Sequence, residues 1–294
     1  MLEAWEDAKR KGIDLMTMLA TASATPKTSP ALSDVLEELA QTKEKSGKSS
    51  RYIDQLRIAI GMFAKGRERF PIGGIAFQDI ERFLDSKQIR SRPTLRARLS
   101  TLFNFSVRRG YRVDNPCDRL ETITLEHIAP AVLTVTETRT VLDWLKLNPR
   151  SLAWFILSTF VGLRPEEAEK TAWSAISFKE GWIRVEAQTS KIRQRRVVYP
   201  MPMAMIWLKQ AKKLKAKLPL APWARRLDRI ALTEVLGWSE WKQDVTRHTC
   251  ASMWLADCGS AATVATALGH SEGTLRKNYM ALVTKADAAK FWGL

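Results

Sequence analysis

Apolar residues recur every three to four positions along most of the chain, which is the spacing that places them on one face of an α-helix. Residues 1–20 fit one short amphipathic helix, and the Ser-, Thr- and Pro-containing residues 21–30 fit a linker. The same spacing predicts an all-α helical bundle over residues 31–120. Its helices are expected to begin near Ser33 or Asp34, at Ser49 or Ser50, at Phe77 and at Pro93.

The helix that starts at Pro93 is rich in arginine. It is expected to run to Arg109 and to end at Gly110, because proline suits the first turn of a helix and glycine the position after its end. Its arginines are candidate contacts to a DNA backbone, and a solvated basic face is the alternative. The candidates are Arg96, Arg98, Arg108 and Arg109.

The helical pattern breaks at Asp114-Asn115-Pro116, and residues 121–134 are expected to form a connector. Helical spacing resumes over about residues 136–147 and 150–161. The apolar run from Leu152 to Leu163 is the longest in the chain, but a bilayer span needs about 20 residues. A buried helix is therefore expected there, and no membrane partner.

A short β section interrupts the helices of this second region. Residues 182–186 alternate apolar and polar side chains, residues 188–190 fit a turn, and residues 195–199 fit a returning strand. The expected fold is mainly α with a small β-sheet, an α+β domain preceded by the all-α bundle. The domains are placed at residues 1–30, 31–120, 121–134 and 135–294.

Charge narrows the class of partner. The 294 residues include 47 Lys and Arg against 31 Asp and Glu, a formal net charge of +16. So large a surplus favours a polyanion, and nucleic acid is the first candidate. A merely soluble basic protein, or one that touches an anionic membrane, is the alternative. The N-terminus lacks the apolar stretch of a signal peptide, so a cytoplasmic protein is expected. The three cysteines form no CxxC pair and the three histidines have no zinc-ligand spacing, so no metal and no cofactor is expected.

The residues that carry chemistry all follow residue 160. In chain order they are Gly162-Leu163-Arg164-Pro165-Glu166-Glu167, Thr189-Ser190-Lys191, Asp244-Val245-Thr246-Arg247-His248-Thr249, Leu268-Gly269-His270-Ser271 and Tyr279. Each motif alone is weak, because short matches arise by chance. Their ordered combination is specific.

This order resembles the catalytic domain of the tyrosine recombinases, the phage-integrase-like site-specific DNA recombinases. That family presents G-L-R-x-x-E, a lysine in a β-hairpin, H-x-x-R-H-T, L-G-H-S, and a tyrosine about nine residues after the last histidine. The resemblance is close over about residues 135–285. It extends more loosely to residues 31–120, where the family carries a helical DNA-binding domain.

The resemblance implies an enzyme that cleaves DNA with Tyr279 as nucleophile and holds the strand as a 3′-phosphotyrosine. Two guanidiniums, Arg164 and Arg247, would clamp the non-bridging oxygens of the scissile phosphate with forked hydrogen bonds. By the same resemblance Lys191 would protonate the departing 5′ oxygen, and His270 would hydrogen-bond the phosphate. Glu167 and His248 are expected to be structural, and Arg193 and Arg195 are further candidate DNA contacts.

The resemblance also implies an assembly of four protomers on two duplexes, in a prokaryotic protein bound to the nucleoid and belonging to a mobile element. The covalent bond retains the energy of the phosphodiester, so neither ATP nor a metal is required. The tail over about residues 280–294 could dock on a neighbouring protomer or fold back on its own domain. Both arrangements remain open at this point.

Asp244 is the departure from the family pattern. It occupies the first position of H-x-x-R, where the family's histidine is thought to handle the proton of the attacking tyrosine. A carboxylate with an ordinary pKa of about 4 is a weaker base than histidine. Slower chemistry or a modified proton path is therefore expected.

Two other functions fit the same residues. One is a catalytically impaired DNA-binding member of the fold, which the aspartate makes plausible. The other is a type IB topoisomerase-like enzyme that relaxes DNA as a monomer. The sequence specifies neither the target site nor a choice between integration, excision and resolution.

Overall fold

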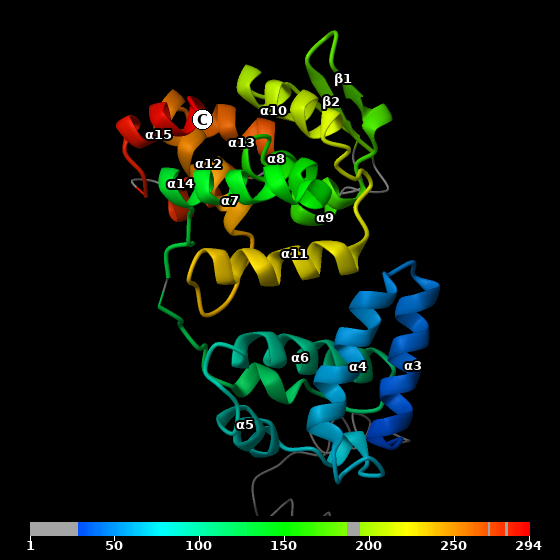
Figure 1. Cartoon of the computed structure of the whole chain (residues 1–294). Coiled ribbons are helices and arrows are strands. Elements are labelled where there is room, and N and C mark those ends of the chain that lie inside the picture. The colour runs from blue at the N-terminus through cyan, green and yellow to red at the C-terminus, as the bar shows by residue number, and fades with distance from the viewer. Residues whose placement is uncertain (1–28, 127, 187–194, 270, 280–281) are drawn as a thin grey trace, which may run out of the picture. The chain divides into compact units, whose positions relative to one another are not determined.

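The computed structural model of the chain describes residues 29–126, 128–186, 195–269, 271–279 and 282–294 (Figure 1). Contacts within the chain divide it into two compact units, Met1–His127 and Ile128–Leu294. Each unit has a hydrophobic core of its own. Two separate cores are typical of two domains, in agreement with the length of the chain.

The first unit is helical over its described residues. Its α-helices are α3 (Leu32–Lys45), α4 (Ser50–Ala64), α5 (Phe77–Asp85) and α6 (Arg92–Arg108), with 3-10 turns η1 (Ile72–Gly74) and η2 (Pro116–Arg119). The apolar positions that predicted these helices do face the core, where α4 packs between α3 and α6. The fully buried side chains include Leu39, Leu56, Ile60, Phe63, Leu99, Leu102 and Phe103.

The helix starts in this unit follow the sequence with one exception. Ser49 caps α4, because its side chain accepts a hydrogen bond from the backbone N–H of Tyr52 at 3.3 Å. The expectation that Ser33 or Asp34 caps the first helix was wrong. Ala31 is the N-cap of α3, and it has no side-chain cap. The start is fixed instead by backbone hydrogen bonds from Leu32 to Phe70 and from Ser33 to Glu68.

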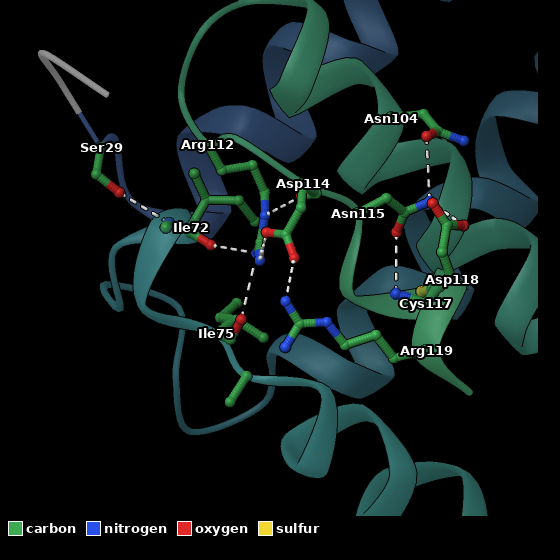
Figure 2. A network of polar contacts seen from close by, with 12 residues as sticks. Ser29, Ile72, Ile75, Asn104, Arg112, Asp114, Asn115, Cys117, Asp118 and Arg119 are labelled. Carbon is green, nitrogen blue, oxygen red and sulfur yellow. Dashed lines mark hydrogen bonds and ion pairs between the residues drawn. The ribbon is translucent and has the colours of Figure 1, made fainter. Parts of the chain in front are cut away.

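The break at Asp114-Asn115-Pro116 is a network of polar contacts (Figure 2). The buried guanidinium of Arg112 donates to the carbonyl oxygens of Ile72 at 2.9 Å and Asp114 at 2.6 Å. Asn115 accepts the N–H of Cys117 at 3.0 Å and so caps η2. These bonds tie the chain that leaves α6 to the turn that precedes α5.

The second unit is mostly helical as well. Its α-helices are α7 (Val135–Leu147), α8 (Leu152–Thr159), α9 (Pro165–Lys170), α10 (Pro202–Lys213), α11 (Pro222–Val235), α12 (Val245–Cys258), α13 (Ala261–Leu268), α14 (Glu272–Tyr279) and α15 (Lys285–Trp292). The apolar run from the sequence is α8, and each of its residues is buried as expected. Helix α12 contacts α8, α13, α14 and α15, so it holds the C-terminal half of the unit together (Figure 1).

A small antiparallel sheet has the strand order β1-β2-β3. Strands β2 (Trp182–Val185) and β3 (Arg196–Val198) are the two predicted strands, and their register pairs Ile183 with Val198. Strand β1 (Ile176–Ser177) was not predicted, since two residues are too few to show an alternating pattern. The mainly α fold with a small sheet is confirmed for this unit.

The C-terminal helix α15 packs on its own unit. It contacts α12 and α7, and Phe291 is fully buried beside Phe160, with ring centroids 4.8 Å apart. Of the two arrangements that the sequence allowed for the tail, this chain shows the folded-back one over residues 282–294. Among the described helices, none combines the length and the hydropathy that a membrane crossing requires.

Candidate active site

Arg164 stands at the end of a tight turn between α8 and α9. Gly162 makes the turn with φ of +73°, and a Cβ at this position would overlap the side chain of Leu268. A residue with a side chain would be strained in this conformation and would have to displace Leu268. The turn brings the half-buried Arg164 guanidinium to the loop after α13, where it donates to the carbonyl oxygen of Gly269 at 2.9 Å.

Glu167 holds two cations in place. Its buried carboxylate pairs with Arg164 at 3.0 Å and with Arg196 of β3 at 2.6 Å. Burial acts to raise the pKa of Glu167, but the hydrogen bond and charge of Arg196, together with Arg164, outweigh it and lower the pKa. The structural role expected for Glu167 therefore has a geometric basis, because its charge orients Arg164 and ties the sheet to α9.

Arg247 lies on α12 and is 3% exposed. Its guanidinium donates to the carbonyl oxygen of Leu268 at 2.6 Å and also to that of Gly162. Burial, followed by the charge of Arg164, lowers the pKa of Arg247 to about 10, so it remains a cation at neutral pH. The two predicted phosphate-binding arginines are thus held by the same two loops.

Tyr279 ends α14 and is 3% exposed. Its Oη lies 2.8 Å from Nδ1 of His248, within hydrogen-bond distance. Burial raises the pKa of Tyr279, and Asp244 raises it further, whereas the charge of Arg247 acts to lower it. The phenol is therefore protonated at neutral pH in this structure, and it lies within the electrostatic influence of Arg247.

Asp244 is the N-cap residue of α12 in a left-handed conformation, with φ of 50°. Its side chain makes no capping bond to the helix. Its charge acts to raise the pKa of both His248 and Tyr279. The residue that replaces the expected histidine is therefore part of the same site, but the side chain within hydrogen-bond distance of Tyr279 is that of His248.

Three of the expected site residues lie outside the described residues. Lys191 and Arg193 belong to the segment that joins β2 to β3, and His270 follows Gly269 directly. Their roles stay predictions. The structure describes only the residues on either side of them. These are strands β2 and β3 around Lys191 and Arg193, and Gly269 and Ser271 around His270.

Four of the remaining predicted DNA contacts have partners within their own unit. Arg96 donates to the carbonyl oxygens of Cys117 and Glu121, and Arg98 lies over the ring of Tyr52 at 4.7 Å. Arg109 pairs with Glu38 of α3 at 2.9 Å. Arg108 is exposed, and Arg195 is exposed and paired with Glu186 at 3.1 Å. Arg96 thus has a structural task within its unit, and DNA contact stays a prediction for each of them.

The chemistry that this arrangement supports can be stated from the side chains alone. The charge of Arg247 acts on a buried phenol, the charge of Arg164 acts on Arg247, and an imidazole lies within hydrogen-bond distance of that phenol. Such a set suits stabilisation of an anion by the guanidiniums and attack by a deprotonated tyrosine. Within the described ranges, no three His, Cys, Asp or Glu side chains come together as a metal site requires.

Sequence reasoning missed the contact between His248 and Tyr279. His248 was expected to be structural, because the family pattern gives the proton-handling role to the first histidine of its motif. The spacing places His248 one turn beyond Asp244, whose carbonyl oxygen accepts the backbone N–H of His248 at 2.9 Å. It could not show the contact with Tyr279, because that contact depends on the packing of α12 against α14.

Neither a scan against models of protein families nor a search of curated proteins finds a match. Solved structures do match. Lambda integrase, as a dimer bound to a COC′ core site, has a TM-score of 0.71 at 17% identity over 95% of this chain and 88% of that chain. Lambda integrase as a tetramer bound to a Holliday junction has a TM-score of 0.70 at 17% identity, over 90% of this chain and 83% of that chain.

A third match is the XerH site-specific recombinase in a post-cleavage complex with a palindromic difH substrate. Its TM-score is 0.60 at 17% identity, over 88% of this chain and 84% of that chain. Lambda integrase and XerH are tyrosine recombinases, and the chain has the tyrosine recombinase fold.

Proposed function

We propose that this protein is a site-specific DNA recombinase that cleaves and rejoins strands through a covalent bond between Tyr279 and a 3′ phosphate. The single observation that carries the proposal is that Arg164 and Arg247, from two separate motifs, bind the adjacent carbonyl oxygens of Gly269 and Leu268. The charge of Arg247 in turn acts on the buried Tyr279.

Each residue has a defined task in the proposed reaction. The guanidiniums of Arg164 and Arg247 bind the non-bridging oxygens of the scissile phosphate, where negative charge grows in the transition state. The Oη–P bond to Tyr279 forms as the bond from phosphorus to the 5′ oxygen breaks. Lys191 is proposed to protonate that oxygen, and His270 to donate a hydrogen bond to the phosphate.

The proposed partner is double-stranded DNA carrying a recombination site. A formal net charge of +16 supports a polyanionic partner. Lambda integrase has been solved as a tetramer on a Holliday junction, and the shared fold supports the proposal that four copies of this chain assemble on two duplexes. A prokaryotic cytoplasmic protein of a mobile element, associated with the nucleoid, is part of the same proposal.

A suicide-substrate assay tests this function. The full-length protein is incubated with a library of nicked duplexes of randomised sequence, and adducts that survive SDS are recovered and sequenced. The expected result is an adduct on a defined sequence, and loss of that adduct in Tyr279→Phe. Tyr199→Phe serves as the matched control, because Tyr199 is 67% exposed and lies outside the site.

A catalytically impaired DNA-binding protein is the second candidate, favoured by one observation. Asp244 stands where a proton-handling histidine is expected, and its charge acts to raise the pKa of Tyr279. Specific binding of a duplex without any SDS-stable adduct would support this candidate and contradict the first. If adducts form, joints between two duplexes distinguish a recombinase from a type IB topoisomerase-like enzyme, which relaxes supercoils without exchanging partners.

A further inference from the structure

His248 contacts the atom that would attack DNA. Its Nδ1 lies 2.8 Å from Oη of Tyr279, and the two ring centroids are 5.5 Å apart. The imidazole comes from the first turn of α12, and the phenol comes from the last residue of α14. Helices α12 and α14 pack against each other, so the contact is set by the core rather than by a loop.

From this contact, and on the premise of the proposed function, we infer that His248 is the proton acceptor for Tyr279. It performs the task for which Asp244 is poorly suited. In the proposed step the phenol donates its proton to Nδ1 of His248 while the Oη–P bond forms. The electron pair of the breaking bond leaves with the 5′ oxygen, which takes its own proton from a separate acid.

Rejoining reverses both transfers. The incoming 5′ hydroxyl gives its proton back to the conjugate base of the separate acid as its oxygen bonds to phosphorus, and the imidazolium of His248 returns its proton to Oη as the Oη–P bond breaks. No proton is gained or lost by the protein over cleavage and rejoining together. A single histidine hydrogen-bonded to the nucleophile therefore serves both halves of the reaction.

The surroundings of His248 favour the neutral imidazole that an acceptor must be. Burial lowers its pKa, Arg247 lowers it further, and Asp244 acts to raise it. Tyr279 has a raised pKa, so the phenol keeps its proton until an acceptor takes it. A histidine with a lowered pKa remains neutral at the pH of the cell, with Nδ1 able to accept.

Asp244 has a different part in this arrangement. Its negative charge lies near enough to act on both His248 and Tyr279. A negative charge stabilises the imidazolium that forms during transfer, in the way that a carboxylate supports a histidine in other proton-transfer sites. Asp244 is thus a positioning residue, which acts through His248.

The first arm of the test does not require DNA. With three histidines in the chain, the ¹⁵N resonances of His248 can be assigned by substitution in the full-length protein. At neutral pH we expect Nδ1 without a proton and Nε2 with one, and a pKa below 6.5. A proton on Nδ1 at neutral pH would overturn the inference, because that tautomer cannot accept from Tyr279.

The second arm measures adduct formation in a single turnover, as a function of pH, on the duplex recovered from the nicked library. His248→Asn places an amide near the position of Nδ1 and preserves a hydrogen-bonding group, but it cannot take a proton. Loss of a general base should slow cleavage by roughly 100-fold or more. The wild-type rate should fall as the pH drops through the pKa of His248, and this acidic limb should be absent in the variant.

Two further variants distinguish proton transfer by His248 from a purely structural role of this residue. Added imidazole should restore adduct formation in His248→Ala, which leaves a space for it. Asp244→Asn should keep the acidic limb but shift it to lower pH, because the removed charge acted to raise the pKa of His248.

The results that would overturn the inference are distinct from those that would overturn the function. If His248→Asn forms adducts at the wild-type rate with an unchanged acidic limb, His248 is not the acceptor, although the recombinase function stands. If the wild-type protein forms no adduct on any member of the library, the proposed function fails, and the catalytic role of His248 fails with it.

Discussion

Asp244 is the site residue that departs from the tyrosine recombinase motif. Its charge acts to raise the pKa of both Tyr279 and His248. We therefore expect Asp244→Asn to lower both pKa values in the free protein. Titration of ¹³C-labelled tyrosine and ¹⁵N-labelled histidine measures them. Unchanged values for both groups would mean that Asp244 is too well screened to influence the site.

Placing the histidine of the tyrosine recombinase motif at position 244 gives a second prediction. Asp244→His should raise the rate of adduct formation if the aspartate is a handicap. If His248 already accepts the proton, a second imidazole adds little. The rate of adduct formation should then rise by less than about tenfold, which is small beside the roughly 10²–10⁴-fold that a general base contributes. Single-turnover cleavage by the variant and the wild type on one duplex provides the comparison.

Glu167 links the site to the stability of the second unit. Glu167→Gln removes the charge that faces Arg164 and Arg196, and breaking such a buried pair should lower the free energy of unfolding by about 3–5 kcal/mol at neutral pH. The lowered pKa of Glu167 means that its contribution is present above 4.5 and is lost as the pH falls through the folded-state value. The difference in free energy of unfolding between the variant and the wild type should therefore decrease below pH 4.5, and chemical denaturation measures it. The exposed neighbour, in Glu166→Gln, is the control.

Motif order in the sequence named Arg164, Arg247 and Tyr279 as candidate site residues, and their catalytic roles stay predictions. It did not identify the partner of the tyrosine. That contact depends on how α12 packs against α14, which is a tertiary arrangement that no local pattern encodes. The tyrosine recombinase motif predicted the proton-handling residue at position 244. In the structure the side chain within hydrogen-bond distance of Tyr279 is that of His248, four positions later.

At the scale of elements, prediction succeeded where the periodicity is long and failed where an element is short. Helices α4, α5, α6 and α8 follow from apolar spacing. The two-residue strand β1 carries no readable period. The start of α3 also escaped prediction, because it is set by backbone bonds to residues more than 30 positions away rather than by a capping side chain.

The turn after α6 allows a direct test of how an element boundary is held (Figure 2). Asn115→Ala removes the acceptor for the N–H of Cys117 and the amide that donates to Asn104 at 3.1 Å. A buried donor left unsatisfied should lower the free energy of unfolding of the first unit by about 2 kcal/mol. Asp118→Ala, at an exposed member of the same network, should change it by less than about 0.5 kcal/mol. Calorimetry compares the two, and equal effects would contradict the capping role.

At the scale of the whole molecule, two separate cores predict two unfolding transitions. Phe291→Ala empties a fully buried position in the second unit and should lower its stability by about 3–5 kcal/mol. Ten of the eleven tryptophans lie in that unit, and Trp5 is the exception, so tryptophan fluorescence follows the unfolding of the second unit. The first unit should keep its transition in calorimetry. Phe70→Ala, at a position 56% exposed, is the matched control, and a common shift of both transitions would contradict independent cores.

On the proposed function, the burial of Tyr279 would protect DNA that carries no recombination site. An exposed phenol near a phosphate-binding arginine would meet every phosphodiester in the cell, and each attack would be a break. With 3% of its surface accessible, this tyrosine is withheld from solvent in the unbound chain. The proposed cleavage would then require a rearrangement driven by the binding energy of the correct site. Fidelity in such a protein would come from keeping its nucleophile hidden, as much as from reading the bases.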